Sequence, residues 1–341
     1  MSNQRPENHP AIKPQKIGVL LLNLGTPDAT DYMSVRRYLS EFLSDKRVID
    51  YPSWLWQPLL QGIILTSRPC RSGAAYKSIW DERTNESPLL VYTRSIAEKT
   101  GSELRSHEDI VVEYGMRYGN PSTAGALKKL TDQGCTKILL FALYPQYSAT
   151  TTATAYDKAF EYLKTVPWQP AIRTAAPWHD HPDYINILAQ SVQDKLDKLE
   201  TAPEVILTSF HGLPKRYLEQ GDPYHCMCCK TSRLVREKLG WPQDKWMTTF
   251  QSRFGPEEWL QPYTDKTIEK LAHDGVKRIA IVSPAFVCEC IETLEEIAME
   301  GKDEFLAAGG EEYTYIPCLN DSDSHIKFLS ELIRKELQGW L

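Results

Sequence analysis

Short apolar segments alternate with amphipathic segments along most of the chain. The apolar segments are typical of buried strands, and residues between them repeat apolar positions at helical spacing, as Val35, Tyr38, Leu39 and Phe42 do. Strands that alternate with helices in this way predict parallel sheets covered by helices. We expect strands at 16–23, 110–114, 137–143, 171–175, 205–209, 246–251, 278–283 and 313–316, and early helices at 34–43 and 90–104.

The two halves of the chain also match at the level of residues. VLLLNLGTP at 19–27 parallels VILTSFHGLP at 205–214, and LTDQGCTKILLFALYP at 130–145 parallels LAHDGVKRIAIVSP at 271–284. Between them, Arg-Tyr-Gly at 117–119 parallels Arg-Phe-Gly at 253–255. Three matches in the same order indicate an internal duplication.

The duplication predicts an α/β fold of two Rossmann-like domains, each with a parallel four-stranded sheet, that face each other across a cleft. We expect a disordered leader at 1–15, an N-terminal domain with an apolar lip at 16–178, and a C-terminal domain at 179–341. The C-terminal domain would carry the candidate histidine and an acidic helix.

Composition excludes some classes of partner. A net charge of −6 argues against nucleic acid, which favours a basic surface. The first residues are polar and lack the apolar core of a signal peptide, and no apolar run reaches the ~18–20 residues of a membrane span. The nearest run, 54–65, is interrupted by polar residues, proline and glycine. We therefore expect a cytoplasmic protein whose eight cysteines are reduced.

The stretch EVILTSFHGLP at 204–214 joins a buried strand to a histidine. We expect Ser209 to Pro214 to form the loop at the carboxyl end of the strand, where parallel sheets bind ligands. A histidine there can act as a base or as a neutral ligand near pH 7. The simpler interpretation is that it caps the strand or packs against Phe210. The first half has Leu24 or Gly25 at this position, so His211 is unique to one half and a better candidate for function.

A line of glutamates follows the strand that ends at Ser283. Four of them fall on one stripe of a predicted α-helix, opposite a core face of Ile291, Leu294 and Ile297 or Ala298. Such a stripe is usually a solvated face near a helix start. The alternative is a cation path, because nitrogen and oxygen ligands suit Fe²⁺, Mn²⁺ or Zn²⁺. The stripe consists of Glu289, Glu292, Glu296 and Glu300.

From about Lys16 the whole chain resembles the ferrochelatases, which insert Fe²⁺ into protoporphyrin IX at the end of haem synthesis. The matching segments are GVLLLNLGTP, YPQYS, SFHGLP followed by GDPY, QSRFGPEEWL and FVCECIETLEEI. The resemblance implies protoporphyrin IX and ferrous iron as substrates, and we expect a monomer. Two positions depart from the pattern. Cys290 replaces a histidine of some relatives, and the C-terminal extension that holds iron–sulfur ligands in some members is absent, because the chain stops at Leu341.

The resemblance assigns catalysis and metal contact to His211 and Glu292, with Glu296 further along the same acidic line as a second metal contact. It also implies an apolar lip at 54–65 that rests on the inner face of a membrane in some members. Flat apolar walls would hold the porphyrin ring, and cations at the edge of the cleft would bind its propionates. For these cations we consider Arg36, Arg37 and Arg47. The expected porphyrin-binding residues are Arg117, Tyr118, Trp259, Phe254, Trp54 and Leu55.

Cys226, Cys228 and Cys229 cluster after the histidine. A [2Fe–2S] cluster, which some ferrochelatases carry, could use them. The spacing CxCC is not a standard ligand pattern and buried reduced cysteines are common, so the cluster is not favoured.

Three other functions remain open. A chelatase for coproporphyrin or cobalt and a non-catalytic tetrapyrrole carrier both fit the residues. A nucleotide-sugar enzyme is disfavoured, because no GxGxxG or Walker pattern follows a predicted strand.

Overall fold

The computed structural model describes residue 8 and residues 15–105 and 110–341, so most of the predicted leader lies outside the described residues. Two four-stranded parallel sheets have the same topology, with the orders β2-β1-β3-β4 and β6-β5-β7-β8. This confirms the predicted α/β class with two matching sheets. The strands are β1 (Lys16–Thr26), β2 (Ile110–Gly119), β3 (Cys135–Ala142), β4 (Ala171–Thr174), β5 (Val205–His211), β6 (Trp246–Gln251), β7 (Arg278–Val282) and β8 (Glu312–Ile316).

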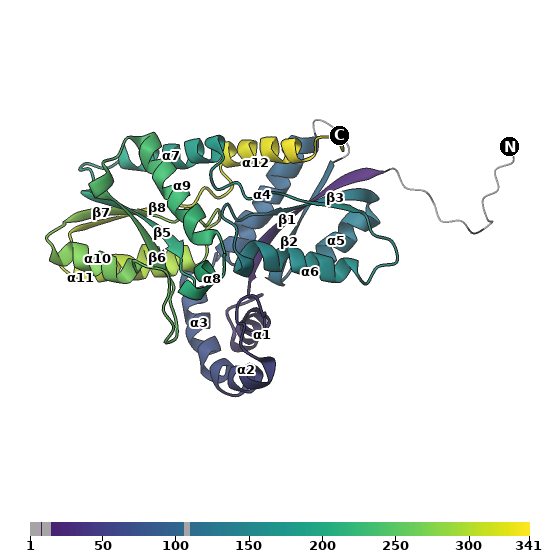
Figure 1. The fold of residues 1–341 in the computed structure, drawn as a ribbon, viewed down its shortest axis with the longest axis horizontal. Helices are drawn as coiled ribbons and strands as arrows, with labels where there is room; N and C mark the ends of the chain where they lie inside the picture. Colours follow the sequence, from purple (N-terminus) through teal and green to yellow (C-terminus); the bar gives the residue numbers. More distant parts are fainter. Residues whose placement is uncertain (1–7, 9–14, 106–109) are drawn as a thin grey trace.

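Helices connect the strands and cover the sheets, while α1, α2 and α3 form a projection below them (Figure 1). The last helix, α12, returns to pack on α4 of the first half. The α-helices are α1 (Tyr32–Leu43), α2 (Ser53–Leu59), α3 (Leu65–Ile79), α4 (Pro88–Arg105), α5 (Thr123–Asp132), α6 (Thr154–Leu163), α7 (Pro182–Leu196), α8 (Lys215–Glu219), α9 (Tyr224–Leu239), α10 (Thr264–His273), α11 (Gly301–Ala307) and α12 (Asp323–Glu336). Shorter elements are the π-helices η1 (Leu60–Ile64), η2 (Ala149–Ala153) and η4 (Glu292–Glu300) and the 3₁₀-helix η3 (Gln243–Lys245).

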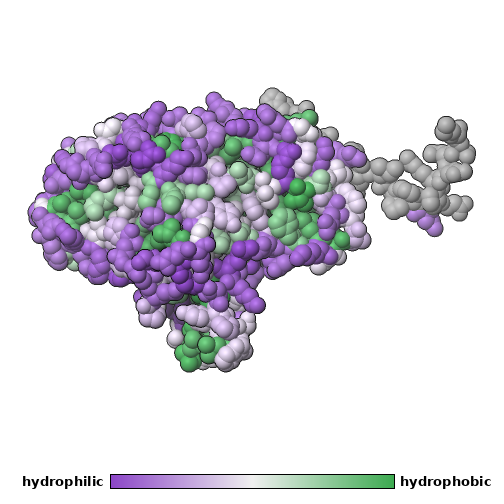
Figure 2. Space-filling view, in the orientation of Figure 1, coloured by the Kyte–Doolittle hydropathy of each residue, from purple (hydrophilic) through white to green (hydrophobic). Residues whose placement is uncertain are grey.

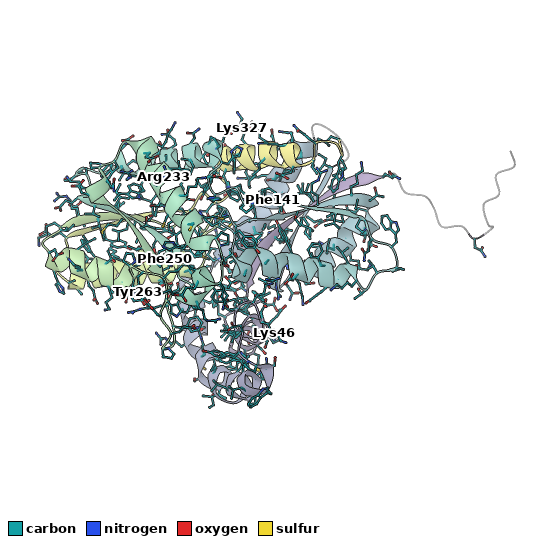
Figure 3. All side chains as sticks on the ribbon, viewed as in Figure 1. Lys46, Phe141, Arg233, Phe250, Tyr263 and Lys327 are labelled. Carbon is teal, nitrogen blue, oxygen red and sulfur yellow. The ribbon has the colours of Figure 1, made fainter. Side chains whose placement is uncertain are left out.

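The central strands are buried on both faces, as continuous apolar runs predict for parallel sheets. One core cluster extends from β1 and β3 through α7 and α12 to β5 and β7. Figure 3 labels Phe141, which belongs to this core, and Phe250, which belongs to a separate cluster beside β5. Trp178, at the predicted domain boundary, packs with its ring 4.9 Å from that of Tyr184. The boundary itself stays a prediction.

The loop predicted from Ser209 is wrong for its first three residues, because β5 continues to His211. Ser209, Phe210 and His211 pair in parallel register with 249–251 of β6, so backbone hydrogen bonds extend the strand beyond its apolar segment. His211 is therefore the last residue of a central strand. None of the helices in the described ranges combines the length and apolar character required to cross a bilayer.

Candidate active site

A cavity of about 760 Å³ opens where the carboxyl ends of both sheets meet. This volume lies within the usual range for small-molecule sites, ~300–1,000 Å³. The ends of β1 and β5 and the segments after β3, β6 and β7 all contribute to its lining. Six of the predicted site residues line it, namely His211, Glu292, Glu296, Trp259, Phe254 and Leu55.

His211 is half-buried at the end of β5. Its Nδ1 lies 2.6 Å from the carbonyl oxygen of Gly212, a distance that fits donation from Nδ1–H. The hydrogen bond made by one ring nitrogen sets the tautomer of the imidazole. Nε2 then keeps its lone pair and can accept a proton or contact a cation.

The acidic segment differs from the predicted α-helix, because Glu292–Glu300 forms the π-helix η4. Hydrogen bonds from i to i+5 widen each turn, and π-helical segments occur mostly at functional sites. The wider turn changes the buried face, which is made by Thr293 and Ile297 instead of Ile291 and Leu294. The predicted core face is therefore wrong in part.

Glu289 does not share the glutamate stripe, since it lies before η4 and is buried. Its carboxylate accepts hydrogen bonds from Tyr315 Oη at 2.7 Å and from the backbone N–H of Cys318 at 3.0 Å. Glu292 and Glu296 line the cavity, whereas Glu300 is exposed. The four glutamates thus occupy different environments, and a uniformly solvated face is excluded.

Glu296 is held by the segment that follows β6. Its carboxylate accepts from the backbone N–H of Ser252 at 2.7 Å, from Ser252 Oγ, and from Gln251 Nε2 at 3.2 Å. Burial raises the pKa of the Glu296 carboxyl, although the hydrogen bonds from Ser252 and the charge of His211 oppose this effect. Glu296 is therefore a half-buried carboxyl group that is anchored by hydrogen bonds.

Glu292 faces phenol groups from the first half. Burial raises the pKa of Tyr76, and the negative charge of Glu292 acts in the same direction; the same two causes contribute at Tyr38 and Tyr144. All three tyrosines line the cavity with Glu292. Within the described residues, neither Glu292 nor Glu296 forms an ion pair with a lysine or arginine.

Trp259 and Phe254 form an aromatic wall beside His211. Their ring centroids lie 4.8 Å apart at an interplanar angle of 60°. Trp259 is 4% exposed and Phe254 43%. A Cβ on Gly212 would lie 3.1 Å from Trp259 Cε3, so the absence of a side chain lets the indole approach the strand end. This wall places aromatic, apolar surface next to the imidazole.

Arg117 and Tyr118 do not line the cavity. Tyr118 is fully buried, and its Oη donates to Asp45 Oδ2 at 2.7 Å. Arg117 Nη2 donates to the same oxygen at 2.5 Å, and its guanidinium lies 4.3 Å from the Tyr118 ring centroid. The structure gives these residues a packing role at the end of β2. Their role in porphyrin binding stays a prediction.

The three arginines considered for the cleft edge have other partners. Arg36 donates to Gln61 Oε1, while Arg37 and Arg47 pair with aspartates. The cavity is lined instead by Arg68 and Arg216, which the sequence pattern did not single out. Both lie near recognisable features, the apolar lip and the Gly-Leu-Pro turn, and this position was the only available signal.

Arg68 and Arg216 differ in their charge partners. Arg216 is paired with Asp50 and Glu257. Arg68 lies 5.8 Å from the Phe254 ring centroid and pairs with no carboxylate of the described chain. Burial, and then the charge of Arg71, lowers the pKa of Arg68. Arg68 is exposed and lines the cavity, so this unpaired cation can reach a negatively charged ligand.

The lip is formed by α2 and η1. Trp54 is 79% exposed and does not line the cavity, whereas Leu55 is 56% exposed and does. In Figure 2 the end of the lower projection is coloured as hydrophobic. Leu59 and Ile63 add exposed apolar surface to the same segment.

The three clustered cysteines do not converge. All three lie on α9, where Cys226 is exposed, Cys228 is buried and Cys229 is intermediate. Among the described residues, no group of three or more His, Cys, Asp or Glu side chains could hold a metal ion. A [2Fe–2S] cluster at these cysteines stays a prediction that is not favoured.

Solved structures similar to this chain include two of the protein SirB. SirB from Bacillus subtilis with Fe³⁺ aligns with a TM-score of 0.56 and 11% identity, over 95% of this chain and 97% of that chain. A sirohydrochlorin chelatase SirB in complex with cobalt, from Bacillus subtilis subspecies spizizenii, aligns with a TM-score of 0.52 and 9% identity, over 94% and 95%. At such identities the likeness concerns the fold alone.

Sequence comparison is more specific. The ferrochelatase of Rhizobium etli is 57% identical over 337 residues, which cover 99% of this chain and 98% of the relative. The ferrochelatase of Agrobacterium fabrum is 57% identical over 336 residues, with 98% of each chain covered. The family model for ferrochelatase matches residues 16–337. The chain therefore belongs to the ferrochelatase family.

Proposed function

We propose that the cavity between the two sheets is the place where this chain inserts ferrous iron into protoporphyrin IX, the reaction of its family. The single observation that carries the proposal is the combination of groups around one cavity of about 760 Å³. A flat apolar ring needs aromatic walls, its propionates need a cation, and its two pyrrole protons need acceptors. The aromatic walls are Trp259 and Phe254, and the cation is Arg68. The proton acceptors are His211 and Glu292.

His211 is the proposed proton acceptor. Because its Nδ1–H is committed to the Gly212 carbonyl, Nε2 is the atom available to a pyrrole N–H or to the incoming iron. Its position at the end of a central strand limits its movement, as a catalytic group requires.

Glu292 is the proposed partner of His211. A carboxylate can accept the second proton or guide a partly dehydrated cation. No cationic side chain of the described residues neutralises Glu292, so its charge is available to iron. We assign Glu296 a place behind Glu292 on the cation path, because its oxygens already accept hydrogen bonds from Ser252 and Gln251.

The walls would hold the ring and deform it. Metal insertion requires nitrogen lone pairs to leave the plane of the macrocycle, and a tight pocket can supply ~1–5 kcal/mol of strain. The tilted pair Trp259 and Phe254 presents a non-planar surface for this purpose. Arg68, unpaired within the described residues, is the proposed partner of a propionate.

The proposal is tested by His211→Ala in an anaerobic assay of Fe²⁺ insertion into protoporphyrin IX. Loss of a general base predicts a fall of about 10²–10⁴-fold in kcat. Porphyrin binding, measured by fluorescence quenching, should persist because the aromatic wall remains. The control is His273→Ala at the exposed end of α10. Full activity of the His211 variant would exclude this assignment.

We also propose that the protein acts in the cytoplasm as a monomer, and that its exposed lip contacts the inner face of the membrane. Trp54 and Ile63 are 79% and 64% exposed, and exposed apolar patches are typical of interaction surfaces. Trp54→Ser with Ile63→Ser should reduce co-sedimentation with anionic lipid vesicles several-fold. The same pair of changes should leave insertion in detergent within about twofold. Equal sedimentation of variant and wild type would contradict membrane contact through the lip.

A further inference from the structure

Gln251 links the strand of His211 to the helix of Glu292. It is the last residue of β6 and lies beside His211 in the parallel register. Its side-chain Oε1 accepts from Ser209 Oγ at 2.7 Å, and its Nε2 donates to the backbone carbonyl of Glu292 at 2.7 Å. A single amide group therefore spans from β5 to η4.

Gln251 also contacts the residue directly after His211 and the carboxylate of Glu296. The backbone carbonyl of Gln251 accepts from the N–H of Gly212 at 2.8 Å, directly after His211. Its Nε2 also donates to Glu296 at 3.2 Å. Gln251 is 4% exposed and does not line the cavity. Its amide is thus occupied on all sides, without access to a substrate.

The next residue, Ser252, donates to both carboxylate oxygens of Glu296. Ser252 has φ of 64°, a left-handed conformation that is rare outside glycine. Its N–H donates to Glu296 Oε1 at 2.7 Å, and its Oγ donates to Oε2. Unusual backbone conformations are retained where the surrounding structure fixes them, often at active sites.

We propose that Gln251 and Ser252 are positioning residues that set the separation of His211 and Glu292. The inference rests on the proposed function of those two groups. From the end of β6, hydrogen bonds fix the backbone directly after His211 and the backbone carbonyl of Glu292. They also fix the carboxylate of Glu296, about one π-helical turn further along η4. A displacement of ~1 Å between reacting groups can cost about 10²-fold in rate, so a fixed bridge has a direct kinetic consequence.

The test compares Gln251→Met with Ser209→Ala. Methionine keeps the length and apolar stem but removes all side-chain hydrogen bonds. We expect kcat for Fe²⁺ insertion to fall about 10²-fold, while the Kd for protoporphyrin stays within about twofold. Ser209→Ala removes one bond to the amide but leaves the bonds to Glu292 and Glu296, so its kcat should fall less than about fivefold. Gln190→Met, on an exposed site of α7, controls for the substitution itself.

A purely structural role would give a different result. If Gln251→Met lowers the melting temperature but the folded fraction keeps the wild-type kcat, the positioning role is overturned. Should Gln251→Met fail to fold, Ser252→Gly serves instead, because glycine accepts the left-handed backbone and keeps the N–H bond. It should lower kcat about fivefold through loss of the Oγ bond. Wild-type kcat in Ser252→Gly would equally overturn the proposal.

Failure of this inference is distinguishable from failure of the proposed function. An inactive His211→Ala with a fully active Gln251→Met would remove only the positioning role. An active His211→Ala would remove the catalytic assignment on which the positioning role depends.

Discussion

The two halves repeat one scaffold but treat charge in opposite ways. Each half places a π-helix after its third strand, η2 in the first and η4 in the second. Thr150 and Thr151 from η2 and Glu292 and Glu296 from η4 all line the cavity. The unusual helix is therefore part of the shared scaffold, and the carboxylates are what the second half adds.

The contrast extends to the ends of the neighbouring strands. In the first half, the charge of Arg117 is neutralised by Asp45 within the protein, with side chains only 10% and 8% exposed. In the second half, His211 and Glu292 face the cavity without such a partner. Charges that are satisfied internally should stabilise the fold, whereas charges that face the cavity should serve the reaction. Substitutions at the Arg117–Asp45 pair and at the His211 and Glu292 pair should then have opposite signatures.

The largest expected effect comes from Glu292→Gln. The amide keeps the shape of the side chain but neither accepts a proton nor attracts a cation, so kcat should fall about 10²–10⁴-fold. Thermal unfolding should change little, because no ion pair of the described residues is lost. Steady-state insertion of Fe²⁺ measures the first effect, and a melting curve the second.

Glu300→Gln makes the same change on an exposed part of the same helix, and should keep wild-type kcat. A second substitution tests the contrast between the two halves directly. Adding Thr151→Glu to Glu292→Gln moves the carboxylate to the other wall, and activity should not return. Recovery of insertion would mean that the location of the charge does not matter.

The next effect concerns stability. Burial acts to raise the pKa of Asp45, but the net pKa is lowered. The causes that lower it are hydrogen bonds from Thr154, the backbone N–H of Arg47 and Tyr118, and the charge of Arg117. Asp45→Asn removes the close partner of Arg117, leaves it only Glu41 at 3.9 Å, and should reduce the free energy of unfolding by about 3 kcal/mol at pH 7. A carboxyl group with a lowered pKa in the folded state stabilises above its unfolded pKa and loses this contribution as the pH falls. The difference between variant and wild type should therefore shrink below about pH 4.

Urea unfolding at several pH values measures this difference. Asp157→Asn is the matched control, since the Asp157 side chain is 47% exposed in its pair with Arg47. Its effect should stay within about 1 kcal/mol. A variant at Asp45 that is as stable as wild type but inactive would reverse the roles that we assign to the two halves.

Much of this arrangement could be predicted from the sequence. The apolar runs located the eight strands of the described residues, and the signal is strongest in the central strands, which are buried on both faces. The differences between the duplicated halves singled out His211 and the glutamates. The end of β5 was predicted too early, because the extension to His211 depends on pairing with β6, about forty residues away.

Two other features were beyond local patterns. The π-helical winding of η4 cannot be read from composition, so the sequence predicted the buried face only in part. The environments of Arg117 and Arg68 depend on which carboxylates the fold brings close. Asp45 lies 72 residues from Arg117 in the chain, and no spacing rule joins them. The sequence alone therefore does not distinguish a cationic side chain that has a carboxylate partner from one that has none.

Arg68 gives the smallest expected effect and the sharpest test of how the first half uses an unpaired charge. Loss of one charge-assisted hydrogen bond to a propionate should raise the KM for protoporphyrin about tenfold in Arg68→Ala, with kcat within about twofold. The dimethyl ester of the porphyrin separates charge from packing. Because the ester lacks the carboxylates, wild type and variant should bind it equally in fluorescence titrations. Arg71→Ala, on the same helix but outside the cavity lining, should match wild type with both ligands. A variant that weakens binding of acid and ester alike would show that Arg68 serves the wall by packing, and that the first half contributes no charge to the site.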